Sequence, residues 1–164
     1  MRPIWISAML AVLGASAARA EGQCQVIDEP IMTMYSGGCG SPVGICTVGT
    51  AGPGALSGTT AFTALTVRQP TPDMLLYTGQ LVVTTSSGTV TIHDHGILNT
   101  TTGEFFEIDQ VVSGTGAYAG ARGLLTTRGM ATGIGFSGTL TGRICNTGAP
   151  AGAGQALVAE ENGE

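Results

Sequence analysis

The segment at residues 93–96, His-Asp-His-Gly, places a carboxylate between two imidazoles, and all three groups can exchange protons or bind metals. In a β-strand, successive side chains point to opposite faces, so Asp94 shares a face with Val90 and Ile92 and is expected to point into a core. A carboxyl group among apolar neighbours has a raised pKa and can serve as a general acid or base, or hold a ligand hydroxyl. The alternative is structural: Asp94 accepts hydrogen bonds from loop backbone.

His93 and His95 fall on the opposite face of the same predicted strand, as paired metal ligands do in some barrels. The chain has only 2 His, so a metal ion would need Asp or Glu as its remaining ligands. The same face carries Thr89 and Thr91, which indicates a solvent-exposed surface. We therefore expect two exposed histidines, no metal site and no other cofactor.

The composition indicates that strands, rather than helices, position these residues. The chain has 27 Gly and 10% charged residues, and no stretch beyond residue 20 shows a sustained helical period. Clusters of Gly, Pro, Ser and Asn separate strand-like runs at 43–49, 55–67, 74–85, 89–98, 104–112, 121–130 and 134–145. This pattern predicts an all-β protein with a single closed antiparallel barrel of about eight strands, stapled by disulfides.

Two connections have the composition of tight hairpins: Thr-Ser-Ser-Gly at 85–88 and Asn-Thr-Thr-Thr-Gly at 99–103. Neighbouring strands are therefore expected to be antiparallel. The last run alternates, with Phe136, Leu140 and Ile144 on the face that should point to the core.

Other runs carry adjacent apolar residues, which put a large side chain on both faces of a strand. The pairs are Leu75-Leu76, Val82-Val83, Phe105-Phe106, Val111-Val112 and Leu124-Leu125. The barrel interior covers one face. We expect a subunit interface in a homo-oligomer to cover the other.

Residues 1–20 have the features of a signal peptide. Arg2 precedes an apolar run, and the Ala-Arg-Ala at 18–20 predicts cleavage before Glu21. The run is shorter than the roughly 20 apolar residues that span a bilayer. We therefore expect a secreted or periplasmic protein without a membrane span, and a disordered Ala/Gly-rich acidic tail at 148–164.

After residue 20 the chain has four arginines and no lysine against 11 acidic residues, a net charge of −7. Such a charge repels nucleic acid and anionic membranes, so neither is an expected partner. The length suits one domain. We expect an N-terminal segment at 21–42, which holds Cys24 and Cys39, followed by the barrel at 43–147.

The chain has four cysteines, Cys24, Cys39, Cys46 and Cys145, and an even number in an oxidising compartment predicts two disulfides. Three pairings are possible, and spacing alone does not choose between them. Cys46 and Cys145 lie at the outer ends of the first and last predicted strands, which a barrel must bring side by side. This favours Cys46–Cys145 together with Cys24–Cys39.

The most specific string is VVSGTGAYAGARG at 111–123, which follows HDHGILNTTTGEFFEID at 93–109. It resembles a motif of the allene oxide cyclase and dirigent superfamily, Gly-(Thr/Ser)-Gly-x-(Phe/Tyr)-x-x-Ala-x-Gly, which lies between two barrel strands. The resemblance covers roughly residues 55–145. It implies an eight-stranded barrel, commonly trimeric, whose members close rings on small hydrophobic molecules or control their coupling.

The resemblance also implies roles for two residues. In the superfamily an acidic residue before a glycine, on the strand preceding the motif, often faces the cavity, and Asp94 has a similar position. Dirigent-like members also use the arginine of the Ala-x-Gly string, matched here by Arg122, which could stabilise an oxyanion in the cavity. Alternatively, Arg122 pairs with Glu107 or Asp109 as a structural bridge.

The glycine string also has a purely structural explanation. Gly114 and Gly116 can take positive φ at a tight corner while Tyr118 plugs the barrel end. Tyr77 and Tyr35 could supply hydroxyl groups to a ligand. Residues 21–164 contain no Trp, unlike the aromatic-lined pockets of the plant enzymes, so the substrate class is not carried over.

Two hypotheses of different classes follow. In the first, an exported barrel binds a small hydrophobic molecule and steers its cyclisation through Asp94 and Arg122, as an isomerase or cyclase, with further ligand contacts from Tyr77, Asp109, Tyr118 and Phe136. In the second, the barrel is filled by its own side chains and acts without catalysis through its outer surface, as a protein-binding or structural module.

Overall fold

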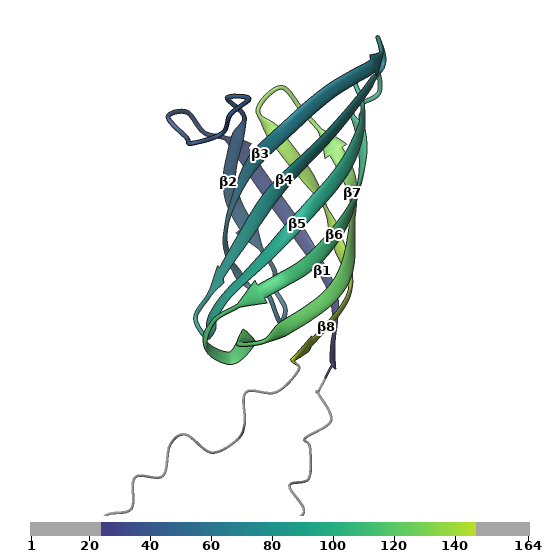
Figure 1. The fold of residues 1–164 in the computed structure, drawn as a ribbon. Helices are drawn as coiled ribbons and strands as arrows, with labels where there is room; N and C mark the ends of the chain where they lie inside the picture. Colours follow the sequence, from purple (N-terminus) through teal and green to yellow (C-terminus); the bar gives the residue numbers. More distant parts are fainter. Residues whose placement is uncertain (1–23, 147–164) are drawn as a thin grey trace, which may run out of the picture.

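Alternating apolar and polar residues fold residues 24–146, the part of the chain that the computed structural model describes, into eight antiparallel strands. Each strand pairs with its neighbour in sequence, and the first pairs with the last, so the sheet closes into a barrel (Figure 1). The predicted all-β barrel is confirmed. The strands are β1 (Cys24–Tyr35), β2 (Cys46–Ala51), β3 (Gly58–Thr71), β4 (Met74–Thr85), β5 (Gly88–Asn99), β6 (Glu104–Gly114), β7 (Ala121–Ala131) and β8 (Gly135–Asn146).

β1 is a full strand of the barrel, although the sequence analysis placed its residues in a separate N-terminal segment. Two residues make its sequence unlike that of a strand. Glu29 occupies an inward position and is 2% exposed, and Pro30 interrupts the apolar pattern. Pro30 is tolerated because β1 pairs with β8 on one side from Cys24 to Met34, but with β2 only from Ile31 onward. The barrel therefore starts at Cys24 and not at residue 43.

The remaining seven strands lie where the sequence pattern predicted them, with ends shifted by a few residues. The connections at 85–88 and 99–103 join antiparallel neighbours, as expected of hairpins. Leu140 and Ile144 of β8 are buried in the core, on the face that alternation predicted. The predicted signal peptide (1–20) and tail (148–164) lie outside the described residues.

One end of the barrel is closed by two side chains from its loops. Leu56, between β2 and β3, is fully buried, and its backbone N–H donates to the Glu29 carboxylate at 2.9 Å. Tyr118, in the short 3-10 helix η1 (Gly116–Tyr118), is also buried, and its hydroxyl donates to the carbonyl of Ala55. Tyr118 thus plugs the barrel end as the sequence predicted. Figure 1 shows this end at the bottom, beside the first residues of β1 and the last of β8.

The corner before Tyr118 depends on Gly116, which has a φ of +58°. Gly114 was expected to share this conformation but does not. Its lack of a side chain serves a close approach instead, because a Cβ there would meet the backbone carbonyl of Tyr118.

The two disulfides join Cys24 to Cys145 and Cys39 to Cys46, so the favoured pairing of Cys46 with Cys145 is wrong. The physical reason is the missed first strand. Cys24 lies directly opposite Cys145 in the β1–β8 register, with a Cα–Cα distance of 3.9 Å. A staple across the closing seam exists, as predicted, but β1 supplies its first half.

The two disulfides should differ in their contribution to stability because they close loops of very different length. The Cys24–Cys145 pair spans 121 residues and the Cys39–Cys46 pair spans 7. Loop-closure entropy predicts that replacing Cys24 and Cys145 by Ala lowers the free energy of unfolding by about 5 kcal/mol, against about 2 kcal/mol for the shorter loop. Urea unfolding of the two double variants checks this. Equal losses would contradict a seam stabilised by chain closure.

Candidate functional site

Asp94 points into the barrel from β5, on the face it shares with Val90 and Ile92. It is 2% exposed, and both apolar neighbours are fully buried. On one side it lies opposite Asp109 of β6, and on the other opposite Gly79 of β4. The inward direction predicted from alternation is confirmed.

Three carboxyl groups from two adjacent strands meet inside the barrel. Asp94 of β5 is joined by Glu107 and Asp109 of β6, which lie on the same inward face of their strand. The Tyr77 hydroxyl donates to Glu107 Oε1 at 2.7 Å, and the Thr127 hydroxyl donates to Asp109 Oδ2 at 2.6 Å. Asp94 and Asp109 hydrogen bond to each other through a shared proton, and no other donor among the described residues reaches Asp94 Oδ1 or Asp109 Oδ1.

Burial and mutual repulsion hold protons on these groups. Burial, followed by the charges of Glu107 and Asp109, raises the pKa of Asp94 well above its usual value. Burial and the charge of Asp109 raise the pKa of Glu107 to about 8. Burial raises the pKa of Asp109 to about 6, against the lowering effect of the Thr127 hydrogen bond. At pH 7 Glu107 is therefore mostly protonated and Asp109 mostly ionised, while burial favours the protonated form of Asp94.

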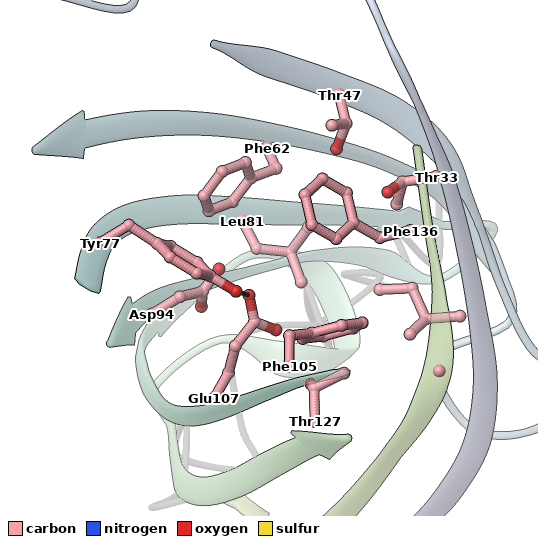
Figure 2. A pocket seen from close by; sticks show the side chains of 12 residues that line it. Thr33, Thr47, Phe62, Tyr77, Leu81, Asp94, Phe105, Glu107, Thr127 and Phe136 are labelled. Carbon is pink, nitrogen blue, oxygen red and sulfur yellow. Dashed lines mark hydrogen bonds between the residues drawn. The ribbon is translucent and has the colours of Figure 1, made fainter. Parts of the chain in front are cut away.

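Aromatic rings surround the carboxyl groups in an inner cavity (Figure 2). The space between its lining atoms is about 430 Å³, part of the opening included, and about 40 Å³ of it can hold the centre of a water molecule. The cavity is therefore narrow, with room for a few waters or a slender ligand group. Its aromatic lining comes from four strands and consists of Phe62, Tyr77, Phe105 and Phe136.

Two glycines let rings lie against the inner wall. A Cβ at Gly96 would collide with the ring of Tyr77, and one at Gly79 with the ring of Phe62. The Phe62 and Tyr77 rings meet edge to face, with centroids 6.3 Å apart. These strand glycines therefore fix where the Tyr77 hydroxyl meets Glu107.

A second, apolar cavity lies at the barrel end opposite Tyr118. The space between its lining atoms is about 450 Å³, open solvent included, and about 90 Å³ of it can hold the centre of a water molecule. It shares Phe62, Tyr77 and Phe136 with the inner cavity. We call it the mouth cavity. Its other lining residues are Tyr35, Ile45, Ala64, Val67, Leu75 and Leu98. The three shared rings form a partition between an apolar mouth and an acidic interior.

The structure brings most of the predicted site residues together. Asp94, Tyr77 and Phe136 line the inner cavity, and Asp109 is buried beside it on Thr127. Tyr118 does not line either cavity, because it closes the far end of the barrel.

Arg122 lies apart from this group. It is exposed on the outer face of β7, where its guanidinium donates to the carbonyl of Ala121 at 2.7 Å. The inward positions of β7 are held by Ala121, Leu125 and Thr127. Arg122 therefore shares no cavity with Asp94, and it does not face the inward-pointing Glu107 and Asp109. The Leu124-Leu125 pair left the inward face of this strand ambiguous in the sequence.

Sequence reasoning missed the role of Glu107, Thr127, Phe62 and Phe105 in the site. The sequence did contain a signal for Glu107: Phe105, Glu107 and Asp109 occupy alternate positions of β6 and therefore lie on the same face of the strand. The adjacent Phe106 obscured it, since both aromatic residues were candidates for the core.

His93 and His95 are exposed on the outer face of β5. Within residues 24–146, no three His, Cys, Asp or Glu side chains are arranged to hold a metal ion. The same residues contain no helix that is long and apolar enough to cross a membrane.

No protein-family model, curated protein or solved structure matches this chain. The eight-stranded antiparallel barrel agrees with the fold that the allene oxide cyclase and dirigent resemblance implies. Membership of that superfamily remains a prediction.

The carboxyl cluster predicts that the protein loses stability as pH rises. A carboxyl group with a raised pKa binds more protons in the folded than in the unfolded state, so stability falls between its unfolded pKa of about 4 and its folded pKa. For Glu107, with a pKa of about 8, the loss should accumulate between about pH 4 and pH 8. Denaturant unfolding across this range checks the slope.

The Glu107→Gln variant should show a flatter dependence of stability on pH, because its side chain does not titrate. Asp28→Asn is the matched control, since Asp28 is exposed on the outer face of β1. If the wild-type protein were as stable at pH 8 as at pH 5, the buried cluster would not be protonated as described.

Proposed function

We propose that this protein is an exported barrel that binds a small hydrophobic molecule through its open end. The apolar body of the ligand lies in the mouth cavity, and its polar end passes the partition rings toward Glu107 and Asp94. The observation that carries the proposal is the pair of adjoining cavities, one apolar and one acidic, joined at Phe62, Tyr77 and Phe136. A concave apolar site with a few converging polar groups is typical of small-molecule binding.

The cluster also has the groups needed for proton transfer. Glu107 is mostly protonated near neutral pH and can act as a general acid, burial favours the protonated form of Asp94, and ionised Asp109 can act as a base. A pair of acids with separated pKa values suits the cyclisation of a bound molecule, the activity that the superfamily resemblance implies. Arg122 has no part in this proposal, since it is exposed on the outside of the barrel. Two disulfides are consistent with an oxidising, extracytoplasmic compartment.

Filling the mouth cavity should weaken binding. Ala64 is 2% exposed and lines that cavity, so the ring of an Ala64→Phe variant would occupy the ligand's place. Titration with N-phenyl-1-naphthylamine, a neutral dye that fluoresces in apolar surroundings, measures the effect. We expect enhanced fluorescence with the wild-type protein and at least about a tenfold weaker affinity for the variant.

Ala61→Phe is the matched control, because Ala61 lies on the exposed face of the same strand. It should bind the dye like the wild-type protein. Equal binding by both variants would place the dye elsewhere and contradict the proposed site.

The outer face supports a second candidate function, as a module that associates with another copy of itself. Leu76, Ile97 and Phe106 lie side by side in register on β4, β5 and β6, and the Arg128 guanidinium stacks 4.9 Å from the Phe106 ring centroid. Leu76 is 40% and Ile97 37% exposed. A row of exposed apolar side chains is typical of a protein interface.

Sedimentation velocity tests this association. If the row is a subunit interface, the protein should form a homo-oligomer, such as the trimer that the resemblance implies, at tens of micromolar. An Ile97→Glu variant should then be monomeric, because it buries an unpaired charge. Val26→Glu, on the exposed face of β1, should leave the assembly intact. A monomeric wild-type protein would remove this candidate.

A further inference from the structure

We propose that the ligand is a lipophilic amine, whose protonated amino group lies among Asp94, Glu107 and Asp109 while its apolar body occupies the mouth cavity. This inference rests on the proposed ligand site and adds the chemical class of the ligand. It is carried by the charges of the barrel interior, the buried aspartate oxygens and the rings of the inner cavity.

The interior has acidic groups and no basic side chain among the residues that the structure describes. Asp94 and Glu107 line the inner cavity and Asp109 is buried beside it, whereas all four arginines and both histidines of residues 24–146 are exposed on the outside: Arg68, Arg122, Arg128, Arg143, His93 and His95. A cationic ligand would supply the missing counter-charge. A carboxylate ligand would be repelled by ionised Asp109.

The two aspartates also lack a donor from any other side chain. Asp94 and Asp109 are 2% and 1% exposed and hydrogen bond to each other through a shared proton, and no other donor among the described residues reaches Asp94 Oδ1 or Asp109 Oδ1. A buried acceptor without a donor costs free energy. An ammonium group in the inner cavity has three N–H donors for Asp94 and Glu107, which line the cavity, while the adjacent Asp109 adds negative charge.

The rings around the carboxyl groups suit a cation as well. Phe105 and Phe136 meet edge to face with centroids 5.5 Å apart, and Phe62 and Tyr77 lie on the other side of the same cavity. Aromatic faces attract ammonium groups, most strongly where water is excluded. An alcohol or ketone of the same size gains neither this attraction nor the ion pair.

Binding an amine should release a proton, because an ammonium beside Glu107 favours its ionised form. The other groups that face this carboxyl are Tyr77 from β4, Asp94 from β5 and Asp109 from its own strand, with the uncharged Thr127 from β7. Burial raises the pKa of Tyr77, so its hydroxyl stays protonated and keeps donating. Glu107, with a pKa of about 8, is mostly protonated at pH 7 and can supply this proton.

Isothermal titration calorimetry of the oxidised protein with octylamine, 1-octanol and octanoate tests the inference. The three probes share a slender apolar chain and differ in charge. At pH 7 we expect octylamine to bind at least about tenfold more tightly than 1-octanol, and octanoate to bind weakest. Repeating the octylamine titration in buffers with different ionisation enthalpies should reveal the release of a proton.

Two variants separate the amine contact from the apolar site. Asp94→Asn and Glu107→Gln should each weaken octylamine binding about tenfold and leave 1-octanol binding unchanged. Asp28→Asn, on the outer face, should change neither. Two isosteric variants are used so that the test survives if one of them fails to fold. Circular dichroism checks the folding of both.

The outcomes distinguish this inference from the proposed function. Equal binding of octylamine and 1-octanol, or tightest binding of octanoate, would overturn the amine class and leave the apolar ligand site standing. If none of the three probes bound, the ligand-binding function would fail, and the inference with it.

Discussion

The pairing of β1 with β8 is the interaction on which the rest of the structure depends. Without it the sheet has two open edges and no interior, and Asp94, Glu107 and Asp109 would lie on a hydrated surface with ordinary pKa values. The seam is paired along eleven residues of each strand and is crossed by the Cys24–Cys145 disulfide. Closure converts three unremarkable carboxyl groups into a buried, partly protonated cluster, so the chemistry of the site is a consequence of topology as much as of residue type.

Closure also divides the protein's charge between two environments. Of the seven acidic residues between 24 and 146, four point into the barrel: Glu29, Asp94, Glu107 and Asp109. All four arginines of the same residues are exposed, together with only three acidic side chains, Asp28, Asp73 and Glu104. The net charge of the chain is therefore a poor guide to the potential at the described surface, and it does not justify excluding anionic partners from this part of the chain.

The local sequence pattern predicted most of this fold. It failed where contacts with neighbouring strands determine whether a segment is a strand and which of its faces points inward. Alternation located seven strands and pointed Asp94 inward, because period-two patterning is a property of a single strand. β1 was missed because Glu29 and Pro30 are unusual in a strand. Here the Leu56 N–H donates to the buried Glu29 carboxylate, and Pro30 lies in register with β8. Because β1 was omitted, Cys145 was paired with Cys46 and not with Cys24. Arg122 and Glu107 were misjudged for a related reason: an adjacent apolar pair leaves a strand's inward face open until its partners fix the register.

The partition formed by Phe62, Tyr77 and Phe136 lies at the level where the two cavities meet, while both ends of the described chain lie at the opposite, plugged end (Figure 1). The polypeptide thus enters and leaves the barrel on the side remote from its opening. A carrier surface or reporter domain linked near Cys24 or Asn146 would hold every molecule with its opening outward. The fold therefore has a direction, and it can be immobilised in one orientation without obstructing access to its interior.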